Sequence, residues 1–167
     1  MDDPRIREAL RLLQPEAGHR LWAGGATTLG CLRGVGAQQA AWKPAPDRHS
    51  IWELALHVAY WKYAVRRNLE GSGRGGFPRS PSNWPRVPEP ADEKAWKQDR
   101  ALLRSEHRKL VAAVQAFEAR RLDDPTPGRG SYRFADLVFG IVSHDVYHVG
   151  QIQMLKRLHA ALGGLDT

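Results

Sequence analysis

Apolar residues recur at every third or fourth position through most of this chain, and that helical period is the strongest constraint on its fold. The clearest stripe lies near the C-terminal end and contains Phe134, Leu137, Ile141, His144, His148, Ile152 and Leu155. No stretch alternates apolar and polar residues in the two-residue period of a half-buried β-strand. The sequence therefore predicts an all-α fold.

Four segments carry the helical period, and stretches rich in Gly and Pro separate them. The first helix is expected to begin at Pro4, because Pro suits the first helical position. The other three are expected at about residues 50–69, 90–121 and 131–164, the last ending at Gly163 and Gly164.

The second helix has the best-defined start. Ser50 followed three residues later by Glu53 has the pattern of a capping box, in which each side chain accepts a bond from the other's backbone N–H. Before this helix, residues 42–46 are expected to be an extended connector. Residues 26–32 are expected to form a second short segment that occupies the same position in the bundle as the first helix.

The connection at residues 71–88 is long and carries no helical period. Fully extended, it can reach ~60 Å, which is enough to cross the bundle and start the third helix parallel to the second. We therefore expect a four-helix bundle with a long crossover between the second and third helices. Nothing in the sequence divides residues 1–167 into more than one domain.

The composition excludes several classes of protein. No apolar run approaches the ~20 residues of a membrane span, and the acidic start of the chain does not resemble an export signal. The chain has one cysteine, Cys31, so it has neither an internal disulfide nor a Cys-based zinc cluster. We expect a cytoplasmic protein in which Cys31 is a small buried hydrophobe.

The net charge of +7 raises the possibility of nucleic-acid binding. The basic residues, however, are scattered in short clusters with acids between them, and they form neither a basic arm nor a DNA-reading motif. Nucleic-acid binding is therefore the weaker interpretation, and a solvated surface is the stronger one.

Two histidines occupy core positions in the last predicted helix. His144 and His148 are four residues apart, which places their Cβ atoms ~5–6 Å from each other on one face and lets both imidazoles bind one ion. His57 lies at the edge of the apolar stripe of the second helix. Each histidine alone would more simply be a hydrogen-bonded core residue. Together they predict a three-histidine metal site with coordination positions open to water or substrate.

The other histidines lack such neighbours and are expected to be surface or capping residues. They are His19, His49, His107 and His159.

Three polar residues near the predicted site have competing interpretations. Glu53 could be a ligand or a base, but the capping box explains it without chemistry. Asp145 stands where zincin motifs carry a catalytic Glu, although orienting a histidine or pairing with an Arg is favoured for it. Gln151 could hold a water or a substrate carbonyl, or bond to a neighbouring helix. The aromatic residues Tyr60, Trp61 and Tyr147 could line the mouth of the site or belong to the core.

Three segments resemble the DinB/YfiT superfamily of metal-binding four-helix bundles. They are HSIWELALH ending at His57, the Trp84-Pro85 pair, and HDVYHVGQI beginning at His144. The resemblance covers residues 42–156. It implies an up-down-down-up bundle, often a homodimer, in which His57, His144 and His148 bind zinc or nickel. Some members of this superfamily are bacillithiol- or mycothiol-dependent S-transferases or thiol-dependent isomerases, and others are regarded as metal-dependent hydrolases. The resemblance therefore implies one of these activities. The family name does not imply DNA binding.

The favoured hypothesis is a metal-dependent enzyme that transfers a low-molecular-weight thiol to an electrophile. Free thiols titrate near ~8.5, and coordination to a divalent cation deprotonates them. A metal-dependent hydrolase is the close alternative. A noncatalytic metal-binding stress-response module, whose ion ties the second and fourth helices together, is the alternative from a different class.

Overall fold

The computed structural model describes residues 3–15, 26–72, 75–127 and 131–162, and these residues contain helices but no β-strand. The α-helices are α1 (Pro4–Leu13), α2 (Ala37–Ala41), α3 (Ile51–Leu69), α4 (Glu93–Ala116) and α5 (Phe134–Ala161). The all-α prediction is confirmed. No helix in the described part of the chain is long and apolar enough to cross a membrane.

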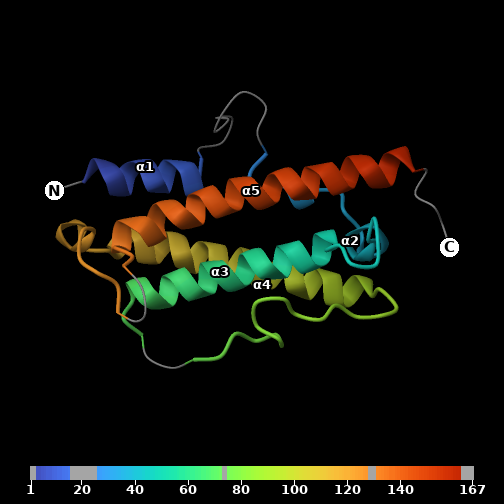
Figure 1. The fold of residues 1–167 in the computed structure, drawn as a ribbon, viewed down its shortest axis with the longest axis horizontal. Coiled ribbons are helices and arrows are strands. Elements are labelled where there is room, and N and C mark those ends of the chain that lie inside the picture. The colour runs from blue at the N-terminus through green and yellow to red at the C-terminus, as the bar shows by residue number, and fades with distance from the viewer. Residues whose placement is uncertain (1–2, 16–25, 73–74, 128–130, 163–167) are drawn as a thin grey trace.

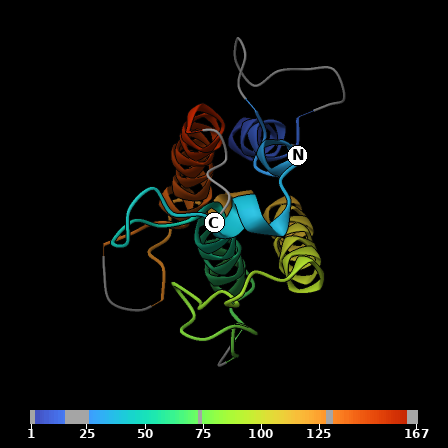
Figure 2. The same ribbon diagram turned by 90° about the vertical axis from the view of Figure 1, so that its right-hand side faces the viewer.

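Four of the helices lie side by side as a bundle, which Figure 2 shows end-on. Helix α3 packs against both α4 and α5, and α1 packs against the same two helices, so α3 and α1 lie diagonally across the bundle. The short helix α2 lies across one end and contacts α3 and α4. Because α3 has neighbours on several sides, more than half of its 19 residues are buried.

Helix α3 begins as the sequence predicts. The Ser50 hydroxyl accepts a bond from the Glu53 N–H at 3.2 Å, and the Glu53 carboxylate accepts one from the Ser50 N–H at 2.8 Å. The helix ends at Leu69, and Gly71 follows with φ +58°, a conformation that favours glycine. The capping box therefore fixes where the turns of α3 fall, including the turn that carries His57.

Helix α4 is shorter at both ends than the predicted range 90–121. The Asp92 side chain accepts a bond from the Ala95 N–H at 2.6 Å, so Asp92 is the N-cap and the helix begins after it. At the other end Phe117 has an extended backbone, and its ring packs against that of Phe134 with the ring centroids 4.9 Å apart. Burial of this aromatic pair ends the helix, and Ala119–Arg121 forms only a 3-10 turn.

The expectations for other short segments were partly wrong. Helix α2 was not predicted, and within residues 26–32 only the 3-10 turn Gly30–Leu32 is regular. Helix α5 begins at Phe134 because the Asp136 carboxylate accepts a bond from the Arg133 N–H at 2.8 Å. Its regular part ends at Ala161, and the glycines expected to end it lie outside the described residues.

The connection between α3 and α4 runs along the outside of the bundle and returns to the end where α2 lies (Figure 1). Phe77 anchors its first part, since this ring is buried against Tyr60 and Tyr63. Farther along, Asn83 and Trp84 contact the ring of His57. The long crossover predicted from residues 71–88 thus covers one side of the predicted metal site.

Candidate metal centre

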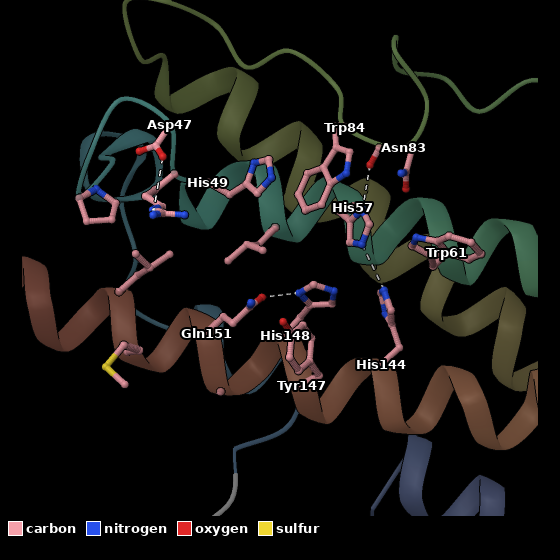
Figure 3. Close-up of a pocket in the computed structure, with 16 residues that line it drawn as sticks. Asp47, His49, His57, Trp61, Asn83, Trp84, His144, Tyr147, His148 and Gln151 are labelled. Carbon is pink, nitrogen blue, oxygen red and sulfur yellow. Dashed lines mark hydrogen bonds and ion pairs between the residues drawn. The ribbon is translucent and has the colours of Figure 1, made fainter.

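Three histidines from two helices converge on one point. His57 projects from α3, and His144 and His148 project from α5 toward it (Figure 3). Each offers a ring nitrogen, and these three atoms lie within 4.8 Å of one another. The Nε2 atoms of His57 and His144 are 3.2 Å apart. Two nitrogens bound to one tetrahedral ion at ~2.0–2.1 Å would be roughly 3.3 Å apart, so this spacing fits a shared ion.

Hydrogen bonds orient two of the rings for coordination. Nδ1 of His57 lies 3.0 Å from the backbone oxygen of Asn83, and Nδ1 of His148 lies 2.6 Å from Oε1 of Gln151. Each partner is an acceptor, so each Nδ1 must carry the proton and donate it. The Nε2 lone pairs of His57 and His148 are then free for a metal, an arrangement typical of ligating histidines.

Aromatic stacking fixes the plane of the His57 ring. Trp84 stacks on His57 with ring centroids 3.8 Å apart and 12° between the planes. On its other face Trp84 stacks on His49 at 3.7 Å and 2°. The crossover is therefore attached to His57 by both a hydrogen bond and a stack, and movement of the crossover would turn the ring.

Burial keeps the three imidazoles neutral. It lowers the pKa of His57 and of His144 to about 4, and it lowers the pKa of His148 as well. Neutral imidazole is the form that binds a metal ion, so all three are ready to coordinate near neutral pH. Within the described chain, Nδ1 of His144 is buried without a hydrogen-bond partner.

The histidines line a pocket of about 990 Å³ between α3, α5 and the crossover. Most of its wall is apolar or aromatic, including Leu54, Trp61, Trp84, Tyr147, Met154 and Leu155. The volume is that of a site for a small organic ligand, far more than a bound water requires.

The three polar candidates have different positions. Glu53 is fully engaged elsewhere, because Ser50 N–H donates to one carboxylate oxygen and Lys43 donates to the other at 2.9 Å. Gln151 does lie in the pocket, but its carbonyl oxygen accepts from His148 on its own helix, which neither interpretation of the sequence foresaw. Its observed role is to orient His148.

The favoured interpretation of Asp145 is wrong. Its carboxylate bonds to the Lys62 ammonium and, at 2.9 Å, to the Thr28 hydroxyl, so its partner is neither an Arg nor a histidine ligand. Successive residues on a helix differ by about 100° in direction, and Asp145 therefore lies on a different face of α5 from His144. The Lys62 side chain is fully buried, which makes this ion pair a second polar link between α3 and α5.

One of the remaining histidines, His107, departs from the expected surface or capping role. His107 is buried on α4 and only 8% exposed, in line with the apolar stripe that contains Leu103 and Leu110. His49 is exposed, as expected, and it also lines the pocket and stacks on Trp84. His159 is half-buried with its ring against Trp42, and His19 lies outside the described residues.

Helical spacing would have revealed Lys62, which lies four residues after Val58 and three before Val65 on the buried stripe of α3. No comparable signal exists for Asn83, because its contact uses a backbone oxygen that any residue would supply.

Two of the three aromatic residues contribute to the site. Trp61 and Tyr147 line the pocket and are partly exposed, whereas Tyr60 packs against Phe77 in the core region. Cys31 is completely buried, and burial raises the pKa of its thiol to about 12. It is the inert small hydrophobe that the sequence predicted.

The comparison with protein families matches the DinB superfamily over residues 20–152, a span that contains all three histidines. The chain belongs to the DinB superfamily. This superfamily is metal-binding, and the three-histidine cluster of this DinB protein fits a divalent metal site. The comparisons with curated proteins and with solved structures gave no match.

Replacing Gln151 by Leu is expected to weaken metal affinity by about 10–100-fold, because His148 loses the acceptor that holds its Nε2 toward the ion. Gln151→Glu keeps an acceptor and should retain most of the affinity. Competition with a chromophoric chelator measures the change, and Gln153→Leu on the same helix is the matched control. Equal affinities for Gln151→Leu and wild type would show that this bond does not orient the ligand.

Acid is expected to destabilise the metal-free protein. Histidines of an unfolded chain titrate near ~6.5, whereas burial holds the pKa of His57, His107 and His144 at about 4 in the folded chain. Between these values the unfolded state binds more protons, so the free energy of unfolding decreases as the pH falls from about 7 to about 5. Urea denaturation in the presence of chelator measures the slope.

The control for this slope is the variant in which His57, His144 and His148 are all alanine. It should show a weaker pH dependence, because only the His107 contribution remains among the three groups with pKa about 4. A wild-type midpoint that does not change over this pH range would contradict the burial argument.

Proposed function

We propose that this DinB protein is a divalent-metal-dependent S-transferase that joins a low-molecular-weight thiol to an electrophile. The observation that carries the proposal is the convergence of three neutral imidazoles on the wall of a large, mainly apolar pocket. A purely structural ion would need no such pocket beside it.

His57, His144 and His148 would hold the ion, and Asn83 and Gln151 keep two of these rings in the tautomer that coordinates. A bound divalent ion supplies Lewis acidity, which lowers the pKa of a thiol or a water that joins its coordination shell. Three protein ligands leave a position for such a group. Imidazole nitrogen suits Zn(II) and Ni(II), and we propose one of these as the ion.

The pocket provides the place for the electrophile. Leu54, Tyr147 and Leu155 give it apolar walls against which the carbon body of a substrate would pack. In the proposed reaction the thiol sulfur forms a bond to an electrophilic carbon, the leaving group departs with the bonding electrons, and the thiol proton leaves with it or passes to solvent. The thiol is proposed to be of the bacillithiol or mycothiol type.

Thiol transfer is favoured over hydrolysis by the lack of a suitable base beside the described histidines. A metal-bound water titrates at ~7 and is only partly hydroxide at neutral pH, so it still gains from a general base within hydrogen-bond reach, whereas a coordinated thiol is deprotonated outright. Glu53 is held in the capping box, Asp145 is paired with Lys62, and Asp47 lies at the other end of the pocket (Figure 3). A thiol that has lost its proton needs no such base.

We also propose that the protein is a cytoplasmic homodimer. Helix α5 and its C-cap residue support the dimer, because they expose large apolar side chains that do not line the pocket. They are Val146, Leu158 and Leu162.

The test is consumption of an alkylating electrophile by the metal-loaded protein, with and without added thiol. A free thiol is only a few per cent thiolate near neutral pH, so metal removal should lower the thiol-dependent rate by roughly 30-fold or more. His57→Ala should do the same, and His159→Ala, away from the pocket, should retain the rate.

Each other outcome has a definite meaning. Equal rates for metal-loaded and metal-free protein would contradict the proposed mechanism. Metal-dependent turnover that proceeds without any thiol would show hydrolysis instead of transfer.

A further inference from the structure

The pocket extends well beyond the three histidines. Along α5 its lining runs from His144 to Leu155, which is roughly 16 Å of helix axis at 1.5 Å per residue. A ligand held at the histidines by one atom therefore has room for a body of about 10 Å in the direction of Leu155. The residues at that far end meet the part of the ligand that takes no part in the chemistry.

Asp47 and Arg48 form the polar part of that far end. Both line the pocket, and both belong to the connector that leads to Ser50, the N-cap of α3. Ser50 itself lies nearly two helical turns before His57. In Figure 3 Asp47 lies at the opposite end of the pocket from His144. Arg48 is the one permanently charged cation among the described residues that line this pocket.

The guanidinium of Arg48 is available to a ligand. Its contact with Asp47 is long, at 3.7 Å, and the two side chains are 68% and 71% exposed. Such exposed pairs contribute little and exchange readily. A carboxylate can instead accept two parallel bonds from a guanidinium, which is a stronger and more directional interaction.

We propose that Arg48 is a specificity-determining residue that binds a single carboxylate of the thiol cosubstrate, about 10 Å from its sulfur. The inference rests on the proposed function, because it takes the sulfur end of the ligand to lie at the histidines. It narrows the thiol proposed above to one that carries a carboxylate far from its sulfur.

The experiment uses cobalt(II)-loaded protein, whose visible absorption changes when sulfur joins the coordination shell. The first probe is 8-mercaptooctanoic acid, which by standard bond lengths puts about 10 Å between sulfur and carboxylate. The second, 8-mercaptooctanol, has the same chain without the charge. The third, 3-mercaptopropionic acid, is too short to reach Arg48.

Wild-type protein should bind the long acid roughly tenfold more tightly than the long alcohol, the scale of one charge-assisted pair. Arg48→Gln should remove this preference, and Arg48→Lys should retain part of it. The short acid should bind Arg48→Gln and wild type equally. Arg108→Gln is the matched control, since Arg108 is an exposed residue of α4, a helix that does not line the pocket.

Equal affinity of wild type for the long acid and the long alcohol would overturn the inference. A preference that survives in Arg48→Gln would overturn it as well. Failure of the proposed function looks different: no thiol, charged or neutral, would change the cobalt spectrum.

In that case calorimetry with octanoate and octanol, which contain no sulfur, still tests Arg48. A preference for octanoate that depends on Arg48 would support carboxylate binding at the far end. No preference would overturn it.

Discussion

The interface between α3 and α5 has to accommodate several polar groups, and the rest of the structure depends on how it does so. A buried polar group costs free energy unless it is hydrogen-bonded, and a buried charge costs more unless it is paired. On one side of this interface, His57, His144 and His148 remain uncharged and meet at one point. On another, Lys62 and Asp145 neutralise each other. The histidine cluster and the Lys62–Asp145 ion pair together hold α3 and α5 at a spacing that lets the three histidines meet.

The partners of the histidines connect this interface to the rest of the chain. Gln151 belongs to α5 itself, whereas Asn83 and Trp84 belong to the crossover. The crossover therefore closes one side of the pocket and also sets the direction of a ligand nitrogen. The same packing thus brings three histidines together, keeps them neutral and leaves an apolar pocket beside them. These features favour a reactive metal site over an ion that only links α3 to α5.

Helical spacing was enough to predict the long helices, the capping box of Ser50 and Glu53, and the three histidines that the structure brings together. These features depend on local periodicity, which one sequence contains. The end of α4 could not be predicted, because the packing of Phe117 on Phe134 depends on residues distant in sequence. The bond from His57 to the Asn83 backbone oxygen carries no residue preference and leaves no trace in the sequence. The partner of Asp145 could not be predicted either, because Lys62 faces it from another helix and no local pattern pairs the two residues.

The central claim is that His57, His144 and His148 together hold one divalent ion. Elemental analysis of the purified chain after loading with zinc or nickel and removal of free metal tests it most directly. The account predicts one ion per chain in the wild type, and none when all three histidines are replaced by alanine while the helical content is retained. Metal retained by the triple variant at the wild-type level, or a wild-type chain that binds none, would contradict it.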